Sequence, residues 1–187
     1  MKTPLCDTCL KSGLLCASCK ARLDSGEITQ DLLDISKLLL EESNNTKSLK
    51  DVKIKSVIGN ENVLLIVCGQ GDSPKLVGKG GSVVRRVGEA IGKRIRVVEE
   101  SSDPRTFLQN IVFPVPILNL NTLYTAKGEK YKVVIPAGSR LPLSPRDFKS
   151  VAKSVLGKDV EIDFEGEIKK ETTEQKINRL VKKIKSE

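Results

Sequence analysis

The sequence predicts an α+β protein in which a short cysteine-rich module precedes two small domains of similar plan. Four of the five cysteines fall within the first twenty residues. After them, segments with helical spacing of apolar residues alternate with pairs of strand-like apolar runs, and this order recurs after residue 100. The 187 residues suffice for two or three such units. We therefore expect four segments, at residues 1–27, 28–100, 101–166 and 167–187.

Composition places the chain among ordinary globular proteins. Hydrophobic residues make up 39% and charged residues 30% of it. No apolar run approaches the roughly 20 residues that a membrane span requires. The first residues also lack the apolar stretch of a signal peptide. These features predict a cytoplasmic protein with no membrane partner.

Several classes of enzyme are excluded by residue type. The chain has no histidine, which removes histidine-based acid–base catalysis and histidine-containing metal sites. It also lacks a nucleophile elbow, a Walker loop and a dinucleotide fingerprint. We expect a protein that is not an enzyme.

The N-terminal cysteines have the spacing of a metal site. They form the pattern Cys6-x2-Cys9-x6-Cys16-x2-Cys19. Each Cys-x2-Cys pair can present two sulfurs to one ion, and two pairs complete a tetrahedral set of thiolates. Disulfides are the alternative, but a cytosolic setting disfavours them. The pattern predicts one structural Zn²⁺, which would supply folding energy that so short a segment cannot obtain from a core. Cys68 lies in the apolar run 63–68 and is expected to be a buried thiol.

Residues 28–68 predict one helix and two strands. Thr29 can cap a helix whose apolar stripe runs from Ile28 to Leu40, and the polar residues 41–48 then predict a connection. Alternating residues around 52–58 predict the first strand. A turn at 59–62 leads to a second, more buried strand at 63–68.

The next stretch carries the most specific motif. Ser73 and Pro74 can start a short helix, which runs directly into the loop Gly78-Lys79-Gly80-Gly81. A second helix is expected from Ser82 to its end at Gly92, and a third strand at 95–98. The loop therefore stands between two helices.

Such a loop suits the binding of a phosphate. Glycine lacks the Cβ that would keep a phosphate away from main-chain N–H groups, and the free N–H groups and positive dipole end of the following helix favour an anion. Residues 75–96 carry seven basic residues against one acidic residue, so +6 of the chain's net charge of +8 lies in this block. The pattern predicts a polyanionic partner, although a solvated basic helix face would show the same charges.

The frame recurs in residues 103–164 without the glycine loop. Asp103 and Pro104 predict the start of a helix, followed by strands near 117–124 and 131–135, a helix after Pro145 and a strand at 160–164. The segment 137–145 stands where the loop would be, and its prolines remove amide donors. Residues 167–187 have apolar residues at helical spacing with lysines opposite, which predicts a basic amphipathic tail.

The order of elements around the glycine loop resembles a type II KH domain over residues 28–100, and residues 101–166 resemble a degenerate KH-like domain without Gly-x-x-Gly. Two such units in tandem resemble the archaeal NusA-like transcription factor family. The resemblance rests on the segment from Leu76 to Ser82 with its basic helix, and on the segment from Asp103 to Asn110. The four-cysteine segment and the missing second loop depart from that family.

The resemblance implies binding of single-stranded RNA, in transcription elongation or termination on nascent RNA near RNA polymerase. KH domains clamp about four nucleotides at this loop. Residues 28–100 contain no Phe, Tyr or Trp, which disfavours an aromatic stacking surface. A protein-interaction adaptor and an RNA-processing or ribosome-assembly factor are the alternatives. The predicted RNA-binding residues are Gly78, Lys79, Gly80, Gly81, Ser82, Arg85 and Arg86, and the predicted metal ligands are Cys6, Cys9, Cys16 and Cys19.

Overall fold

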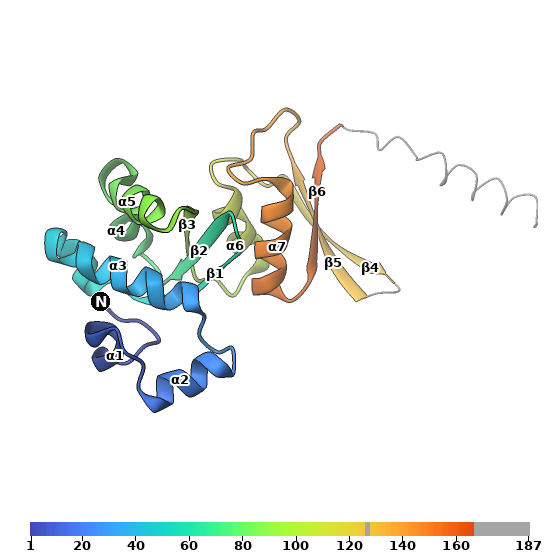
Figure 1. Ribbon diagram of the computed structural model, residues 1–187. Helices are drawn as coiled ribbons and strands as arrows, with labels where there is room; N and C mark the ends of the chain where they lie inside the picture. The colour runs from blue at the N-terminus through green and yellow to red at the C-terminus, as the bar shows by residue number, and fades with distance from the viewer. Residues whose placement is uncertain (126–127, 167–187) are drawn as a thin grey trace, which may run out of the picture.

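A computed structural model describes residues 1–125 and 128–166 as a mixed α+β fold with two three-stranded sheets (Figure 1). The predicted basic tail at 167–187 lies outside the described residues. In the part that is described, no helix combines the length and apolar character needed to cross a bilayer. The first elements are α1 (Asp7–Ser12), α2 (Ala17–Asp24), α3 (Gln30–Asn45) and the short 3-10 helix η1 (Lys47–Asp51).

The first sheet has the order β1-β2-β3. The strands are β1 (Ile54–Gly59), β2 (Val63–Cys68) and β3 (Arg94–Glu99). β1 pairs with β2 antiparallel, and β2 pairs with β3 in parallel. A parallel pair needs a crossover connection. Here the crossover holds α4 (Ser73–Val77), the 3-10 turn η2 (Lys79–Gly81) and α5 (Ser82–Ile91).

The second sheet repeats this topology. It follows α6 (Pro104–Val112), and β4 (Asn119–Thr125), β5 (Gly128–Ile135) and β6 (Asp159–Phe164) lie in that order. β4 and β5 are antiparallel, and β5 and β6 are parallel. The crossover between β5 and β6 contains a single helix, α7 (Pro145–Leu156), and no helix at 136–144. The recurrence predicted from the sequence is therefore present in the strands, while the counterparts of α4 and η2 are missing.

β2 is buried on both faces and thereby joins two cores. All six of its residues are buried. Leu64, Ile66 and Cys68 pack into one core with α3 and α5. The alternate residues Val63, Leu65 and Val67 pack into a second core with α6, α7 and the second sheet. In Figure 1, α6 and α7 lie between the two sheets. β2 thus contributes side chains to both hydrophobic cores.

The N-terminal segment is attached to the first core. Lys2 accepts a hydrogen bond from the N–H of Ile54 and donates one to Val52, each at 2.8 Å, so it extends the edge of β1. Leu5 and Leu10 are buried in the core that contains α3. Figure 1 shows α1 and α2 below α3. The segment therefore contributes side chains to the main core.

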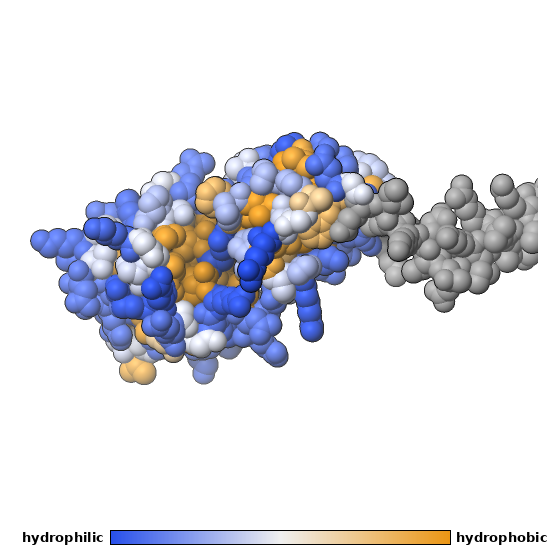
Figure 2. All heavy atoms as spheres, turned by 90° about the horizontal axis from the view of Figure 1, so that it is seen from above, coloured by the Kyte–Doolittle hydropathy of each residue, from blue (hydrophilic) through white to orange (hydrophobic). Residues whose placement is uncertain are grey.

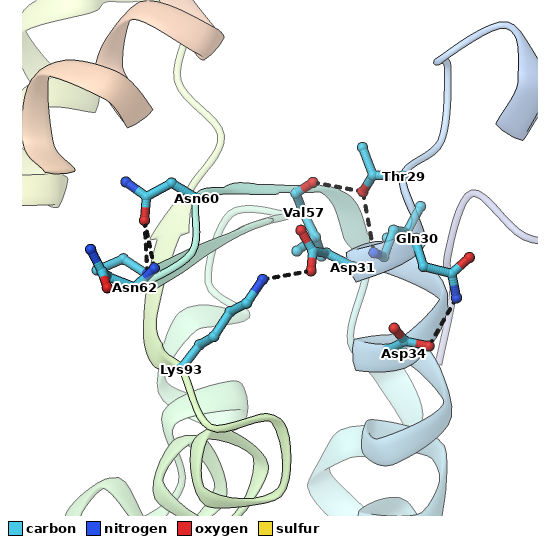
Figure 3. A network of polar contacts seen from close by, with 10 residues as sticks. Thr29, Gln30, Asp31, Asp34, Val57, Asn60, Asn62 and Lys93 are labelled. Carbon is cyan, nitrogen blue, oxygen red and sulfur yellow. Dashed lines mark hydrogen bonds and ion pairs between the residues drawn. The ribbon is translucent and has the colours of Figure 1, made fainter.

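The start of α3 confirms the predicted cap. The Oγ1 of Thr29 accepts from the N–H of Leu32 at 3.2 Å and donates to the carbonyl of Val57 at 3.1 Å, which ties the helix to β1 (Figure 3). At the other end the prediction was wrong: residues 41–45 continue the helix. Tertiary contacts explain this extension, because Glu42 pairs with Arg86 on α5 and Ser43 is buried.

Candidate metal centre and nucleic-acid interface

The four N-terminal cysteines converge on one point. The sulfurs of Cys6, Cys9, Cys16 and Cys19 all lie within 4.8 Å of one another. The Sγ atoms of Cys6 and Cys16 are 3.9 Å apart. Two thiolates that share a tetrahedral zinc, each at about 2.3 Å, lie about 3.8 Å apart. The separation therefore suits a shared ion, and it is far longer than a disulfide bond of about 2.05 Å.

Each Cys-x2-Cys pair forms a tight turn, or knuckle, at the start of a short helix. Cys6 and Cys16 are the N-cap residues of α1 and α2, which places Cys9 and Cys19 one turn later and buried. Backbone N–H groups point at the sulfurs: Cys16 N–H donates to Cys9 Sγ at 3.0 Å, and Cys19 N–H donates to Cys16 Sγ at 3.5 Å. The four residues thus lie within metal-binding distance on two similar turns.

Hydrogen bonds within the cluster change its acidity. The N–H of Cys19 stabilises the thiolate of Cys16 and, with the neighbouring thiols, lowers the pKa of Cys16 to about 7. The N–H of Cys16 likewise favours the thiolate of Cys9, but the hydrogen bond from Cys6 and burial outweigh it and raise the pKa of Cys9 to about 12. The sulfurs compete for protons at close range, which a bound cation would relieve by favouring thiolates.

The predicted phosphate loop stands between α4 and α5. Gly78, Gly80 and Gly81 have φ of 74°, 61° and 77°, a conformation that side chains with a Cβ rarely adopt. Gly81 is the N-cap of α5, and no side chain caps this helix end. The first N–H groups of α5 therefore have no side-chain acceptor, and the loop beside them is exposed at Lys79 and Gly80.

The three glycines serve different purposes. A Cβ on Gly78 would lie 2.6 Å from Cγ2 of Val83, a buried residue, so this glycine lets α4 approach α5. A Cβ on Gly80 would meet nothing within 4 Å. Gly80 and Lys79 are exposed at the tip of the loop. Gly78 is thus required by packing, whereas Gly80 leaves open space that a ligand can enter.

Only some of the basic residues in the block 75–96 are free of ion pairs and thus available to a ligand. Arg86, predicted to attract RNA, is paired with Glu42: its Nε lies 3.0 Å from both carboxylate oxygens, and these hydrogen bonds lower the pKa of Glu42. Lys75 is paired with Asp72 at 2.8 Å, and Lys93 with Asp31 at 3.1 Å (Figure 3).

Three exposed basic residues of the block have no such partner. Lys79, Arg85 and Arg94 take part in no ion pair within the described part of the chain. Lys79 lies at the loop tip, Arg85 one turn into α5, and Arg94 at the start of β3. Cations without an ion-pair partner therefore extend from the loop across α5 to β3, where Arg85 and Arg94 line a groove that Glu61 and Glu89 also line.

Three grooves lie beside the loop helices. One, of about 890 Å³, is lined by Gly78, Lys79 and Ser82 and lies on the side of α3. The other two lie on the side of β3. The larger of these two has a volume of about 920 Å³, and Gly81, Arg85 and Arg94 are among its lining residues. The smaller has a volume of about 540 Å³ and lies between α4, β3 and the end of α6. Viewed from above, the surface has an apolar band between hydrophilic side chains (Figure 2). Both grooves on the side of β3 are lined by Val84, Ile95 and Arg96, so they form adjoining parts of one surface.

Arg96 and Phe113 belong to this surface and were not predicted from the sequence. The guanidinium of Arg96 donates to the carbonyl of Phe113, burial lowers its pKa, and its Nε has no hydrogen-bond partner among the described residues. Phe113 is 64% exposed. It lies beyond residues 28–100, so an aromatic side chain borders the groove although that segment contains none. The only sequence signal for Phe113 is that an aromatic residue directly follows the apolar stripe of the helix that begins at Pro104.

No protein-family model matches the chain. Two curated proteins match part of it, both described as "Probable transcription termination protein NusA". The protein of Methanocaldococcus jannaschii is 30% identical over 71 residues, which is 38% of this chain and 39% of that protein. The protein of Methanococcus vannielii is 33% identical over 64 residues, which is 34% of this chain and 36% of that protein.

About a third of the chain is homologous to archaeal NusA. The chain spans less than two fifths of each NusA relative. The crystal structure of APE1850 is similar in fold, with a TM-score of 0.52 and 22% sequence identity. The similarity covers 68% of this chain and 96% of that one.

Proposed function

We propose that residues 28–100 form a type II KH domain that binds single-stranded RNA, and that residues 101–166 form a KH-like domain without the phosphate loop. Gly78, Lys79, Gly80 and Gly81 would hold the RNA backbone with the first N–H groups of α5 at Ser82. Arg85 would add positive charge. Arg86 would add less than the sequence predicts, because Glu42 neutralises it.

One observation carries this proposal. The loop presents left-handed, Cβ-free backbone at the uncapped N-terminus of α5, and unpaired cations continue from it along a partly apolar groove. Main-chain N–H groups and a helix dipole suit a phosphate. An apolar floor beside them suits the bases of an unpaired strand, whose edges a duplex would hide. No catalytic group is needed for this role, so the proposed function is not enzymatic.

We also propose that the cysteine cluster holds one structural Zn²⁺. The sulfur separations and the two N–H-supported knuckles fit a four-thiolate tetrahedral site. The ion would draw α1 and α2 together and help to keep Leu5 and Leu10 in the core beneath α3. Thiolates stay reduced in the cytoplasm, where we place the protein.

The cellular role that we propose is that of a NusA-like factor in transcription elongation or termination, acting on nascent RNA near RNA polymerase. It is supported by the partial homology to two proteins described as transcription termination proteins. Copurification of RNA polymerase with the tagged protein, with and without RNase, tests this role. Recovery that survives RNase indicates direct contact, and recovery lost with RNase indicates bridging by RNA. No recovery in either case would contradict the role.

RNA binding is tested by charge reversal at the loop tip. The variant Lys79→Asp with Gly80→Asp should weaken binding to a short unstructured RNA by at least about tenfold in a fluorescence anisotropy titration. Both positions are exposed, and aspartate tolerates the left-handed backbone at Gly80 better than most residues, so the fold should survive.

A matched control separates local from general electrostatics. Lys149→Asp with Ser150→Asp makes the same change in charge at two adjacent exposed positions on α7, bordering a groove that shares no residue with those beside the loop. It should bind RNA nearly as tightly as the wild type. Equal loss in both variants would contradict a phosphate site at the glycine loop.

A further inference from the structure

Phe113 combines exposure with an unusual location. In the described part of the chain, three large hydrophobic side chains are exposed, namely Leu14, Phe113 and Tyr124. Of these, Phe113 lines the groove between α4, β3 and α6. A single exposed apolar side chain is common, but an aromatic ring that lines a groove can pack against a flat group bound there.

The backbone that carries the ring is held in place. The N–H of Phe113 donates to the carbonyl of Gln109 at 2.9 Å, and its carbonyl accepts from Arg96 on β3. Beyond it, the Gln109 side chain donates to Val115 at 2.8 Å and accepts from the N–H of Ile117 at 2.7 Å. The neighbours Val112 and Val115 are buried. The ring is therefore presented by fixed backbone, which reduces the entropy lost when a ligand binds.

The surroundings of the ring favour one class of ligand. The groove beside it is lined by the aliphatic side chains of Val77, Val84 and Ile95, which would accept a flat apolar group. The adjoining groove brings Arg85 and Arg94, which take part in no ion pair among the described residues. A ligand that carries planar apolar groups on a negatively charged backbone matches both. An apolar peptide would leave the positive charges unanswered.

Arg96 strengthens this preference. Its guanidinium is partly buried, and its Nε lacks a partner within the described residues. A cation removed from water gains more from a nearby anion than an exposed one does. It is hydrogen-bonded to the carbonyl of Phe113, so it lines the same groove as this residue.

We propose that Phe113 stacks on a base of the bound single-stranded RNA. The second unit, residues 101–166, then supplies an aromatic platform to the groove between α4, β3 and α6, which binds the RNA of the first unit, residues 28–100. This proposal rests on the proposed RNA binding at the glycine loop and adds a residue to it. Phe113 lies fourteen residues beyond Glu99, the last residue of β3, and it follows α6, which packs against β3. The second unit then contributes to RNA binding without a phosphate loop of its own.

The chain contains no tryptophan, which provides a selective probe. In the 187-residue chain, Phe113→Trp should bind an oligoadenylate about as tightly as the wild type, and its fluorescence should be quenched as the bases stack on the indole. Phe113→Ala should weaken binding by about fivefold or more, as expected for one base–aromatic stack. Its salt dependence should stay unchanged, because the ring carries no charge.

Tyr124 supplies the matched control. It is 80% exposed on β4, so Tyr124→Ala and Tyr124→Trp remove or replace an exposed aromatic elsewhere. Neither should change affinity, and the tryptophan there should not be quenched. Inorganic polyphosphate, which has the charges without bases, should bind Phe113→Ala as well as the wild type and leave the Phe113→Trp signal unchanged.

The outcomes distinguish the two proposals. Binding of oligoadenylate by the wild type, and its loss in Lys79→Asp with Gly80→Asp, would support the loop site. If Phe113→Ala then binds normally and Phe113→Trp is not quenched, stacking is refuted although the loop site stands. If the wild type does not bind oligoadenylate or any other single-stranded RNA, the proposed function fails. Thermal melting of each variant should show that it remains folded, since Phe113 is not part of the core. A change in affinity then reflects binding.

Discussion

Gly78→Ala and Gly80→Ala should have very different effects on stability, although both glycines belong to the same loop. Gly78 has φ 74° and ψ 173°, a region that is essentially restricted to glycine and costs about 1–3 kcal/mol for another residue. The new methyl would also lie 2.6 Å from Cγ2 of Val83, which is buried and branched at Cβ. Overpacking of this kind costs a further 1–3 kcal/mol or so.

We therefore expect Gly78→Ala to lower the free energy of unfolding by about 2–6 kcal/mol. Gly80 has φ 61° and ψ 23°, and its methyl would meet no atom within 4 Å. Only the left-handed backbone then opposes the substitution, at about 1–2 kcal/mol. For a protein of this size, each kcal/mol shifts Tm by about 2–4 °C.

Urea denaturation of the two variants, monitored by circular dichroism, measures the difference. The urea midpoint for Gly78→Ala should fall well below that for Gly80→Ala. Gly80→Ala should remain folded, so its RNA binding can be measured. Equal destabilisation within about 0.5 kcal/mol would refute the packing role assigned to Gly78.

Four further predictions concern the metal, the buried thiol of Cys68, the hydrogen-bonded carboxylate of Asp147 and the salt dependence of RNA binding. Purified protein should contain about one zinc per chain, and Cys16→Ser should release it; folded metal-free protein with four free thiols would contradict the site. Because Cys68 is buried and burial raises its pKa to about 12, iodoacetamide should spare this thiol in native protein stripped of metal while modifying the exposed Cys6 and Cys16, which mass spectrometry would show. Hydrogen bonds from Ser144 and Asn60 lower the pKa of Asp147. Its carboxylate therefore stabilises the fold above the ordinary pKa of about 3.9, and this contribution is lost as the pH falls through the lower pKa of the folded state. Asp147→Asn should lower the free energy of unfolding by about 1–2 kcal/mol at neutral pH and progressively less in acid. With three unpaired cations near the loop, the logarithm of RNA affinity should fall with the logarithm of salt at a slope of about −2, and a slope near zero would exclude phosphate contacts.

Local patterns in the sequence predicted most of the elements, because each has a short-range cause. Thr29 and Asp103 cap their helices as expected, and alternation of apolar residues located the strands. Convergence of the four cysteines also followed from spacing alone.

What the sequence could not provide depends on contacts between distant residues. Glu42 lies 44 residues from Arg86, so neither the longer α3 nor the neutralised arginine could be read from neighbours. The position of Phe113 beside β3 depends equally on how α6 packs. Periodicity reveals which face of an element is apolar, but not which partner covers it.

The two-sided burial of β2 has a consequence for how the chain can be divided. Cutting at residue 100 would leave Val63, Leu65 and Val67 facing water, so a fragment limited to the first unit would lose one wall of its central strand. Amides of β2 should accordingly be among the slowest in the protein to exchange hydrogen, at a rate set by opening of the whole molecule. The two sheets should then unfold together, so residues 28–100 depend on residues 101–166 for one side of their core.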